Sequence, residues 1–394
     1  MKSQSINILR IDFILLLCVL VLIILGAAIM YSASSYKGET QKSSSEYFLS
    51  RHLVRVVVGV AIMIIVAAIP YQVWLGLSPI FYVVSLFMLV LLFTGSPFSV
   101  AANGSVRWLR FGPIAFQPSD FARYALILLL ARVLKERGEE LEDFWRGYAK
   151  MLLLVGVIVV PIALERDLST AMMITIIAFV MFFFAQVKLS YLMVTASSFM
   201  SITLAYVLTS EYQRQRLISF INQLLESQTF PYQVKQSLIS FAQGGLLGRG
   251  LGNSLQKYEF LPEAHKDFIF SILGEELGFI GAVFVLGLFM LFIYRGVRIA
   301  RNAPDYYGVL LAGGITVCIG TYAMFNAGVA VALLPTTGLP MPFFSFGGSS
   351  LVSHLAAIGL LINISMQGHQ NYANYFGWPA LQDRLNRPIF KDKR

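Results

Sequence analysis

Residues 13–30 read FILLLCVLVLIILGAAIM and decide the class of fold, because no charged side chain interrupts them. At about 1.5 Å of rise per residue, a helix needs about 20 apolar residues to cross the hydrocarbon core of a bilayer. The run is long for the apolar part of a secretory signal peptide, and further runs follow it. We therefore expect an uncleaved first transmembrane helix.

Apolar runs of this kind recur along the whole chain. Of the 394 residues, 57% are hydrophobic and only 13% are charged, about half the charged share of a typical soluble protein. This composition excludes a soluble globular enzyme, a disordered protein and a disulfide scaffold. We predict an all-α polytopic membrane protein that forms a single domain over residues 1–394. The ten expected transmembrane helices cover residues 11–31, 53–69, 73–93, 120–134, 151–164, 168–186, 189–209, 268–294, 306–333 and 346–366.

The distribution of Lys and Arg predicts the orientation in the membrane. The net charge is +9, and much of the excess flanks the apolar runs, so we interpret it as a sign of orientation and not of nucleic-acid binding. The bias places both termini in the cytoplasm. The basic tail at 367–394 would then meet anionic lipid headgroups or, alternatively, a cytoplasmic partner. The large loop 210–267, between the seventh and eighth helices, faces outward together with the loops 94–118 and 334–345.

Cysteine and histidine form no recognisable metal or disulfide pattern. Cys18 and Cys318 lie inside apolar runs, no CxxC motif occurs, and the four histidines are scattered. The sequence therefore supports neither a zinc site nor a disulfide framework.

Charged residues in or beside the spans are energetically expensive and are functional candidates. Asp120 and Arg123 lie three residues apart in QPSDFAR, so they can pair on one face of the fourth span, which Ser119 can cap. The pair is either structural or in contact with a substrate. The turn ERDLST at 165–170 is a solvated turn, a helix-ending network or a catalytic site.

The densest polar stretch, KYEFLPEAHKDFIF at 257–270, closes the large outer loop. Asp267 would lie at a helix start, either as an N-cap or as a general base at the mouth of a cavity. The helix dipole there favours its ionised form. Glu275 and Glu276 follow about 12 Å deeper in the membrane. We expect at least one of them to be paired inside the bundle.

Two stretches have the composition of a cavity lining. The run GGLLGRGLG at 244–252 lacks the order of a phosphate-binding loop, and we interpret it as flexible or re-entrant backbone beside a cavity. Residues 334–350 mix Pro, Gly and hydroxyl side chains at membrane depth. We therefore expect an outward-facing cavity that suits a phosphorylated lipid, and the residues leave open whether that lipid is moved or altered. The basic residues that could neutralise a phosphorylated lipid in this cavity are Arg107, Arg110, Arg123, Lys257 and Lys266.

Together these motifs resemble the SEDS proteins (shape, elongation, division, sporulation), the membrane peptidoglycan glycosyltransferases of bacteria. The resemblance covers nearly the whole chain, with several long motifs in the right order. They are NGSVRW at 103–108, QPSD at 117–120, ERDLST at 165–170, YQ and QS at 232–237, the run at 244–252, and the stretches 261–278 and 334–350. The form PEAH at 262–265 is closer to the division branch (FtsW) than to the elongation branch (RodA).

The resemblance implies a reaction and its location. Family members polymerise lipid II into glycan strands on the outer face of the bacterial cytoplasmic membrane, and undecaprenyl pyrophosphate leaves. The family's essential aspartate falls on Asp267, which would take the proton of the acceptor hydroxyl in an inverting displacement. Arg107 and Lys257 would offset the charge of the leaving pyrophosphate. A divalent cation, Mg²⁺ or Mn²⁺, would bind through the pyrophosphate, so no protein residue is assigned to it.

The resemblance also assigns roles to other residues. Glu259 matches a family acidic position and would position Lys257 or the metal. The further substrate- or pyrophosphate-binding candidates are Asp120, Arg123, Gln236, Lys266 and Ser349. The structural or cavity-lining candidates are Glu165, Asp167, Glu275 and Glu276.

The chain departs from the family pattern at five positions. The family has Glu, Lys, Pro, Gly and Thr where this chain has Asp120, Arg123, Arg166, Ser169 and Lys266. We expect Lys266 to stabilise ionised Asp267 and weaken it as a base, or to hold pyrophosphate.

The resemblance implies partners as well. These are a class B penicillin-binding protein, which crosslinks the new strands, and divisome proteins at the septum. Two other functions are alternatives to the glycosyltransferase: a lipid II flippase, and a non-catalytic scaffold for a transpeptidase.

Overall fold

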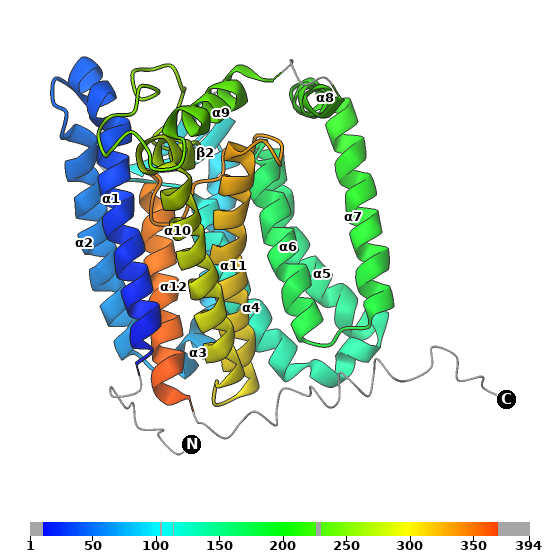
Figure 1. The fold of residues 1–394 in the computed structure, drawn as a ribbon. Coiled ribbons are helices and arrows are strands. Elements are labelled where there is room, and N and C mark those ends of the chain that lie inside the picture. Colours follow the sequence, from blue (N-terminus) through cyan, green and yellow to red (C-terminus); the bar gives the residue numbers. More distant parts are fainter. Residues whose placement is uncertain (1–10, 103–104, 113, 226–229, 369–394) are drawn as a thin grey trace.

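The structure is a computed structural model that describes residues 11–368 except 103–104, 113 and 226–229 (Figure 1). A bundle of long helices dominates it. The helices are α1 (Phe13–Lys42), α2 (Tyr47–Ala68), α3 (Tyr71–Phe93), α4 (Pro118–Glu136), α5 (Ala149–Leu164), α6 (Leu168–Phe184), α7 (Leu189–Thr209), α8 (Glu211–Leu225), α9 (Tyr232–Gly244), α10 (Ile269–Arg301), α11 (Tyr306–Ala330) and α12 (Gly348–Gln367). Short 3₁₀ and π-helical turns at Gly138–Glu142 and Phe144–Tyr148 precede α5.

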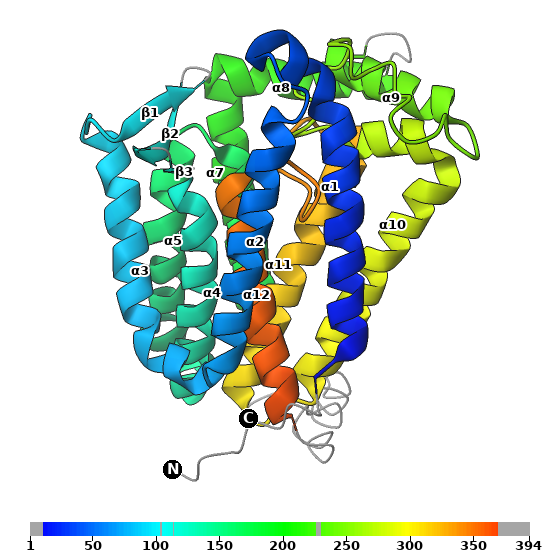
Figure 2. The same cartoon turned by 90° about the vertical axis from the view of Figure 1, so that its left-hand side faces the viewer.

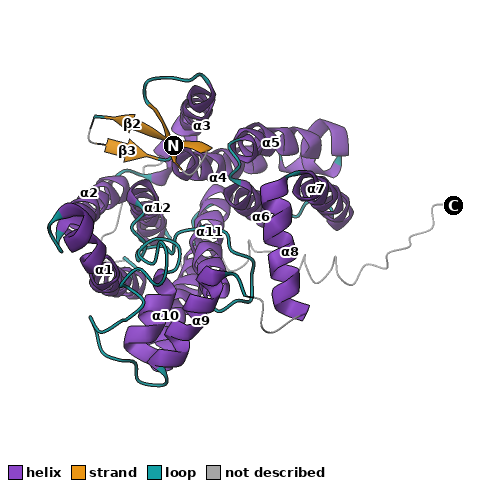
Figure 3. Ribbon diagram, turned by 90° about the horizontal axis from the view of Figure 1, so that it is seen from above, coloured by secondary structure: helices purple, strands orange, loops and turns teal. Residues whose placement is uncertain are grey.

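Each of the ten expected spans falls on one of these helices. Eight helical segments of the described chain are long and apolar enough to cross a membrane. The other two expected spans are α4, which carries Asp120, Arg123 and Arg132 among its apolar residues, and α6, which has 17 residues. The chain is therefore a polytopic, predominantly helical protein. Seen from above, α11 lies near the middle of the bundle, and α4, α6, α10 and α12 surround it (Figure 3).

The first helix is longer than expected. The apolar run predicts an end near residue 31, but α1 continues to Lys42, so its polar last turns extend beyond the apolar segment. It ends at Ser43, whose φ of 55° is left-handed and whose N–H donates to the Gly38 carbonyl.

The expectation of an entirely helical chain is wrong in the loop 94–118. Strands β1 (Ser99–Ala102), β2 (Ser105–Phe111) and β3 (Ile114–Phe116) form an antiparallel sheet there, in the order β1-β2-β3. In the register, Val100 faces Trp108 and Arg110 faces Ala115. The large loop 210–267 likewise contains α8 and α9 and is not purely irregular.

The start of α4 also differs from the expectation. Gln117 holds the N-cap position, and Pro118 begins the helix, where its missing N–H costs no hydrogen bond. The Ser119 hydroxyl is buried without a hydrogen-bond partner in the described part of the chain, so it is not the cap. Aspartate side chains cap three other helices. Asp12 accepts from the Leu15 N–H at 2.9 Å at the start of α1, Asp167 from the Thr170 N–H at 3.2 Å at the start of α6, and Asp305 from the Gly308 N–H at 2.7 Å at the start of α11.

The glycine run is joined to a break in α10. Gly278 interrupts that helix with φ 69° and ψ −170°. Four backbone hydrogen bonds of 2.9–3.2 Å join residues 245–250 to residues 275–280, so the protein satisfies the polar groups that the break exposes. A β-carbon on Gly248 would lie 2.2 Å from the Glu276 carbonyl oxygen, so only glycine fits there.

The functional loops gather at one end of the bundle. Figures 1 and 2 show the sheet, α8 and α9 at one end, and the start of α1 and the end of α12 at the other. At the latter end, Arg295 donates to both carboxylate oxygens of Asp12 at 2.6–3.0 Å. The Asp12 N–H contacts the Ser365 hydroxyl at 3.3 Å. We call these the outer and the inner end. The predicted basic tail lies almost entirely outside the described residues.

Candidate active site

Asp267 lies at the outer end, in the turn that leads into α10. Its N–H donates to the Glu263 carbonyl at 3.1 Å. The N-cap position belongs to Phe268, which has no side-chain cap bond, so the N-cap interpretation of Asp267 is wrong. A β-carbon on Gly338 would lie 3.4 Å from Asp267 Oδ2, so the carboxylate faces the segment 335–340.

A clamp of hydrogen bonds holds this segment against Asp267. The Asn326 Nδ2 atom of α11 donates to the carbonyl oxygens of Asp267 and Leu339, both at 2.8 Å. The Ser345 hydroxyl donates to the Lys266 carbonyl at 2.5 Å, and the Phe346 N–H donates to the His265 carbonyl at 2.9 Å. Asn326 is 1% exposed. Sequence reasoning missed it, although a lone amide inside an apolar span was an available signal.

Burial governs the protonation of Asp267. Burial and, to a smaller extent, the negative charge of Glu263 raise the pKa of this carboxyl against the positive charges of Lys266 and Arg216, and the net result is a pKa of about 6. The charge of Lys266 favours the ionised form, as expected, but the desolvation of a carboxylate packed under the clamp outweighs it, so the pKa of Asp267 moves upward overall. The expected effect of the helix dipole stays a prediction. A carboxyl with a pKa close to neutrality is suited to accept a proton.

Lys266 is paired with Glu263 and not with Asp267. Its ammonium lies 2.5 Å from Glu263 Oε2, and Lys37 of α1 lies 3.3 Å from the other oxygen. Burial raises the pKa of Glu263, but the hydrogen bond and charge of Lys266 and the charge of Lys37 outweigh it and lower the value to about 2. Glu263 therefore stays ionised beside Asp267.

Arg216 of α8 is a second residue that sequence reasoning missed. Its charge acts on Asp267, although the two lie far apart in the sequence. The helix that carries it falls in a stretch that the sequence indicated only as a loop, so no helical face was considered there.

The predicted pair in α4 is confirmed. Arg123 Nη2 lies 3.2 Å from Asp120 Oδ1, and Ser349 of α12 donates to Asp120 Oδ2 at 2.7 Å. The Arg123 guanidinium packs over the rings of Tyr322 and Tyr124 at 4.3 and 5.1 Å. Arg123 is only 1% exposed. The pair therefore links α4, α11 and α12 below the clamp, and its contact with substrate stays a prediction.

The turn at 165–170 is a helix-ending network and not a solvated turn. Asp167 caps α6 and accepts from Gln117 Nε2 at 3.2 Å. Arg107 of β2 donates to the carbonyl oxygens of Glu165 and Arg166 at 3.3 and 2.6 Å, and its guanidinium lies 3.9 Å from Asp167. Burial raises the pKa of Glu165 to about 8. Arg107 thus supports the turn between α5 and α6, and its expected contact with pyrophosphate stays a prediction.

Glu275 and Glu276 are buried inside the bundle, as expected, and hydrogen bonds engage them, although Glu276 Oε2 has no hydrogen-bond partner in the described part of the chain. Glu275 accepts from the Ser254 hydroxyl and from the Leu255 N–H at 2.8 Å. Glu276 accepts from the Ser32 hydroxyl of α1 and from the Ser254 N–H at 3.3 Å. Both carboxylates therefore fasten the segment after the glycine run to the break in α10.

Of the remaining predicted residues, Lys257 and Glu259 lie between α9 and α10, and Gln236 lies on α9. Lys257 donates to the Gly252 carbonyl, while Glu259 is reached by Gln41 at 3.5 Å. No ion pair joins Lys257 to Glu259 among the described residues, so the structure does not support the expected positioning of one by the other. Gln236 is half-buried on α9, which Ser237 ties to the Ala330 carbonyl at 2.5 Å.

The sequence profile of the Cell cycle protein family FtsW/RodA/SpoVE matches residues 12–370. This chain belongs to that family. Among curated FtsW/RodA/SpoVE proteins, it is 36% identical over 356 residues to the "Probable peptidoglycan glycosyltransferase FtsW" of Geobacter metallireducens, with 90% of this chain and 95% of the relative covered. It is also 36% identical over 354 residues to the "Stage V sporulation protein E" of Bacillus subtilis, with 90% and 96% covered.

Solved structures of the family share the fold. One described as "Structural coordination of polymerization and crosslinking by a peptidoglycan synthase complex" has a TM-score of 0.74 at 26% identity, covering 92% of this chain and 99% of that chain. The rod shape determining protein RodA of Thermus thermophilus has a TM-score of 0.67 at 26% identity, covering 92% and 98%.

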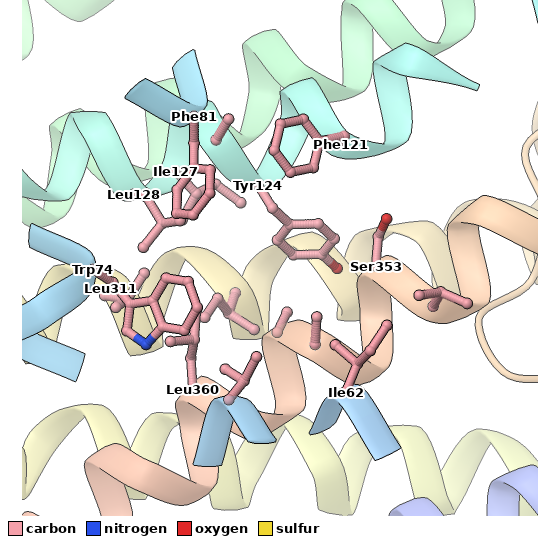
Figure 4. A pocket seen from close by; sticks show the side chains of 16 residues that line it. Ile62, Trp74, Phe81, Phe121, Tyr124, Ile127, Leu128, Leu311, Ser353 and Leu360 are labelled. Atoms are coloured by element: carbon pink, nitrogen blue, oxygen red, sulfur yellow. The ribbon is translucent and has the colours of Figure 1, made fainter. Parts of the chain in front are cut away.

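An apolar cavity opens in the body of this FtsW/RodA/SpoVE-family bundle. It has a volume of about 250 Å³ and lies between α2, α3, α4, α11 and α12. Figure 4 shows the rings of Trp74, Phe81, Phe121 and Tyr124 around it. Tyr124 also donates to or accepts from His354 Nδ1 at 2.6 Å, so this wall adjoins the buried Arg123 cluster.

The residues near Asp267 fit a divalent cation only in part. In the described part of the chain, no group of three or more His, Cys, Asp or Glu side chains is arranged to hold a metal ion. Glu263, the carboxylate next to Asp267 in the same turn, is engaged by two lysines. This donor set fits Mg²⁺ or Mn²⁺ held chiefly by phosphate oxygens and water, and it does not fit a protein cage.

Proposed function

We propose that this chain is a peptidoglycan glycosyltransferase that polymerises lipid II into glycan strands and releases undecaprenyl pyrophosphate. The observation that carries the proposal is Asp267, a carboxyl clamped at the outer end of the bundle with its pKa raised to about 6. The names of the relatives support the same reaction.

Asp267 acts as the general base. It takes the proton of the acceptor hydroxyl while that oxygen attacks the anomeric carbon of the other sugar. The glycosidic bond forms as the bond to pyrophosphate breaks, so one displacement inverts the configuration and needs no covalent sugar on the protein. The clamp through Asn326 and Ser345 fixes the carboxylate, because small errors in position are costly for proton transfer.

The leaving pyrophosphate needs positive charge as its bond breaks. Lys257, Lys266 and Arg107 are the basic residues of the outer end that we assign to this task. A divalent cation bound through the pyrophosphate would supply further neutralisation, and Asp267 and Glu263 are the carboxylates that could help to hold it. The apolar cavity between α2, α3 and α4 accommodates part of the prenyl chain, which needs a path free of charge.

The proposal includes a place and a partner. The outer end faces away from the cytoplasm, and the FtsW names of the relatives favour synthesis at the division septum together with divisome proteins. The related complex that coordinates polymerisation and crosslinking favours a class B penicillin-binding protein as the partner.

The alternatives receive less support from the described residues. A lipid II flippase needs a polar path through the bilayer. The two acidic residues that suggest one, Glu275 and Glu276, are buried and fasten the segment at Ser254 to α10, with only Glu276 Oε2 left without a hydrogen-bond partner among the described residues. A non-catalytic scaffold does not need a clamped carboxyl of raised pKa.

The test uses purified full-length protein with lipid II, alone and with its cognate transpeptidase. We expect glycan strands and undecaprenyl pyrophosphate in at least one of these mixtures. A folded protein that forms no strands in either mixture, but moves lipid II across vesicle membranes, would establish the flippase instead. Absence of both activities, with the transpeptidase still bound, would establish the scaffold.

A further inference from the structure

A cavity with both polar and apolar walls lies at the outer end, beside the candidate active site and separate from the apolar cavity. Its volume is about 210 Å³, and its walls are α8, the start of α9 and the segment around Thr336. The residues of α8 that line it are Gln215, Arg216, Ser219, Phe220 and Gln223.

These five residues form one face of α8. Their spacing of one, three or four residues places them on the same side of a helix. The exposed apolar residues Ile218, Ile221 and Leu225 lie on the opposite side. The helix therefore turns its polar face to the cavity and its apolar face away from it, as a helix at a membrane interface does.

The cavity is fixed close to Asp267. Gln223 Nε2 donates to the Ala332 carbonyl at 2.8 Å, which ties α8 to the end of α11. Thr336 stands two residues before Gly338, which lies against the Asp267 carboxylate. The charge of Arg216 reaches Asp267 as well. A ligand in the cavity would thus lie next to the reacting bond and not on it.

We propose that this cavity binds one sugar residue of the glycan strand, adjacent to the sugar that reacts at Asp267. This inference rests on the proposed function. Neutral amide and hydroxyl groups such as those of Gln215, Ser219 and Thr336 match sugar hydroxyl and acetamido groups. The Phe220 ring offers an apolar surface to a sugar face. A pyrophosphate would need more positive charge than the single guanidinium that lines the cavity.

Through this contact the glycan strand would bind the protein at a second site, in addition to the site of the reacting sugar. A polymerase that holds only the reacting sugar releases the strand after each addition. One that also holds the neighbouring sugar keeps it for further additions. The cavity therefore predicts an effect on strand length.

The test compares wild type with Gln215→Ala and Phe220→Leu in two measurements on purified full-length protein. The first measures the binding of a soluble tetrasaccharide of alternating N-acetylglucosamine and N-acetylmuramic acid by saturation-transfer NMR. The second measures the length of the strands formed from lipid II. Asn222→Ala is the matched control, because Asn222 is an exposed amide of the same helix that does not line the cavity.

We expect each cavity variant to bind the tetrasaccharide about fivefold more weakly, as the loss of one neutral contact implies. The strands should become shorter, while Asn222→Ala matches wild type. Thr336→Val, on the opposite wall, should act in the same direction and serves as the second variant if thermal unfolding shows that an α8 variant is misfolded.

Two results would overturn the inference. One is a wild-type protein that does not bind the tetrasaccharide, and the other is a set of folded cavity variants with wild-type binding and strand length. A protein that binds the tetrasaccharide through these residues but forms no strands would contradict the proposed function and leave the sugar site in place.

Discussion

The proposed base, Asp267, would work only when it is ionised, so its surroundings are expected to set the pH at which the protein is active. The pKa of about 6 implies that the rate of polymerisation falls as the pH drops through about 6. The positive charge of Arg216 lowers this pKa. Arg216→Gln should therefore move the acid limb of the pH–rate profile to higher pH, while Arg214→Gln, an exposed arginine of the same helix, should leave it in place. Coincident acid limbs for Arg216→Gln and wild type would refute the electrostatic account.

Asn326 is expected to be a positioning residue. Asn326→Ala removes the donor that joins Asp267 to Leu339 and leaves two carbonyl groups unsatisfied, at a cost of about 1–3 kcal/mol in unfolding free energy. Asp267 should then be less buried, and the acid limb of the pH–rate profile should move to lower pH as kcat falls.

Asn363 provides the control for that experiment. It is a buried amide at the inner end, where it donates to the Ala67 carbonyl at 2.7 Å. Asn363→Ala should lower stability by a similar amount without moving the pH–rate profile. A profile that moves in both variants, or in neither, would reduce the clamp to a structural contact.

At the scale of elements, the join between the glycine run and α10 is the most constrained feature. Gly248 and Gly252 both have left-handed φ values, 81° and 82°, but only Gly248 faces a backbone atom within 4 Å. Alanine at either position costs about 1 kcal/mol for the left-handed backbone. Gly248→Ala should add a steric clash and lower the thermal unfolding midpoint further than Gly252→Ala. Equal midpoints would show that the join is looser than described.

Elements differ in how far the sequence predicts them. The ten apolar runs all became helices, because apolar length is a local property, and the Asp120–Arg123 pair followed from their spacing on one helix. The sheet at 99–116 and the helices α8 and α9 were missed, because they lie in polar stretches where no apolar run marks them. The clamp and the raised pKa of Asp267 depend on Asn326 and Gly338, which only the tertiary fold brings to residue 267.

At the scale of the whole molecule, the two ends of the bundle must face opposite sides of the membrane. Lys42 is exposed at the outer end of α1, and Asn302 is exposed at the inner end of α10. The native Cys18 and Cys318 are buried, so labelling by a maleimide can be assigned to a single introduced cysteine. A membrane-impermeant maleimide should label Lys42→Cys in intact cells and Asn302→Cys only after lysis. The reverse pattern would place Asp267 on the cytoplasmic side and contradict the proposed location.

The central claim is that Asp267 is the base of a lipid II polymerase. Its most direct test is strand formation from lipid II by purified Asp267→Asn protein in complex with the cognate transpeptidase, beside wild type. Asparagine keeps the shape of the side chain but cannot accept the proton, so the rate should fall by at least about 10²-fold while folding and partner binding persist. Strand formation at the wild-type rate by a folded Asp267→Asn protein would contradict the account.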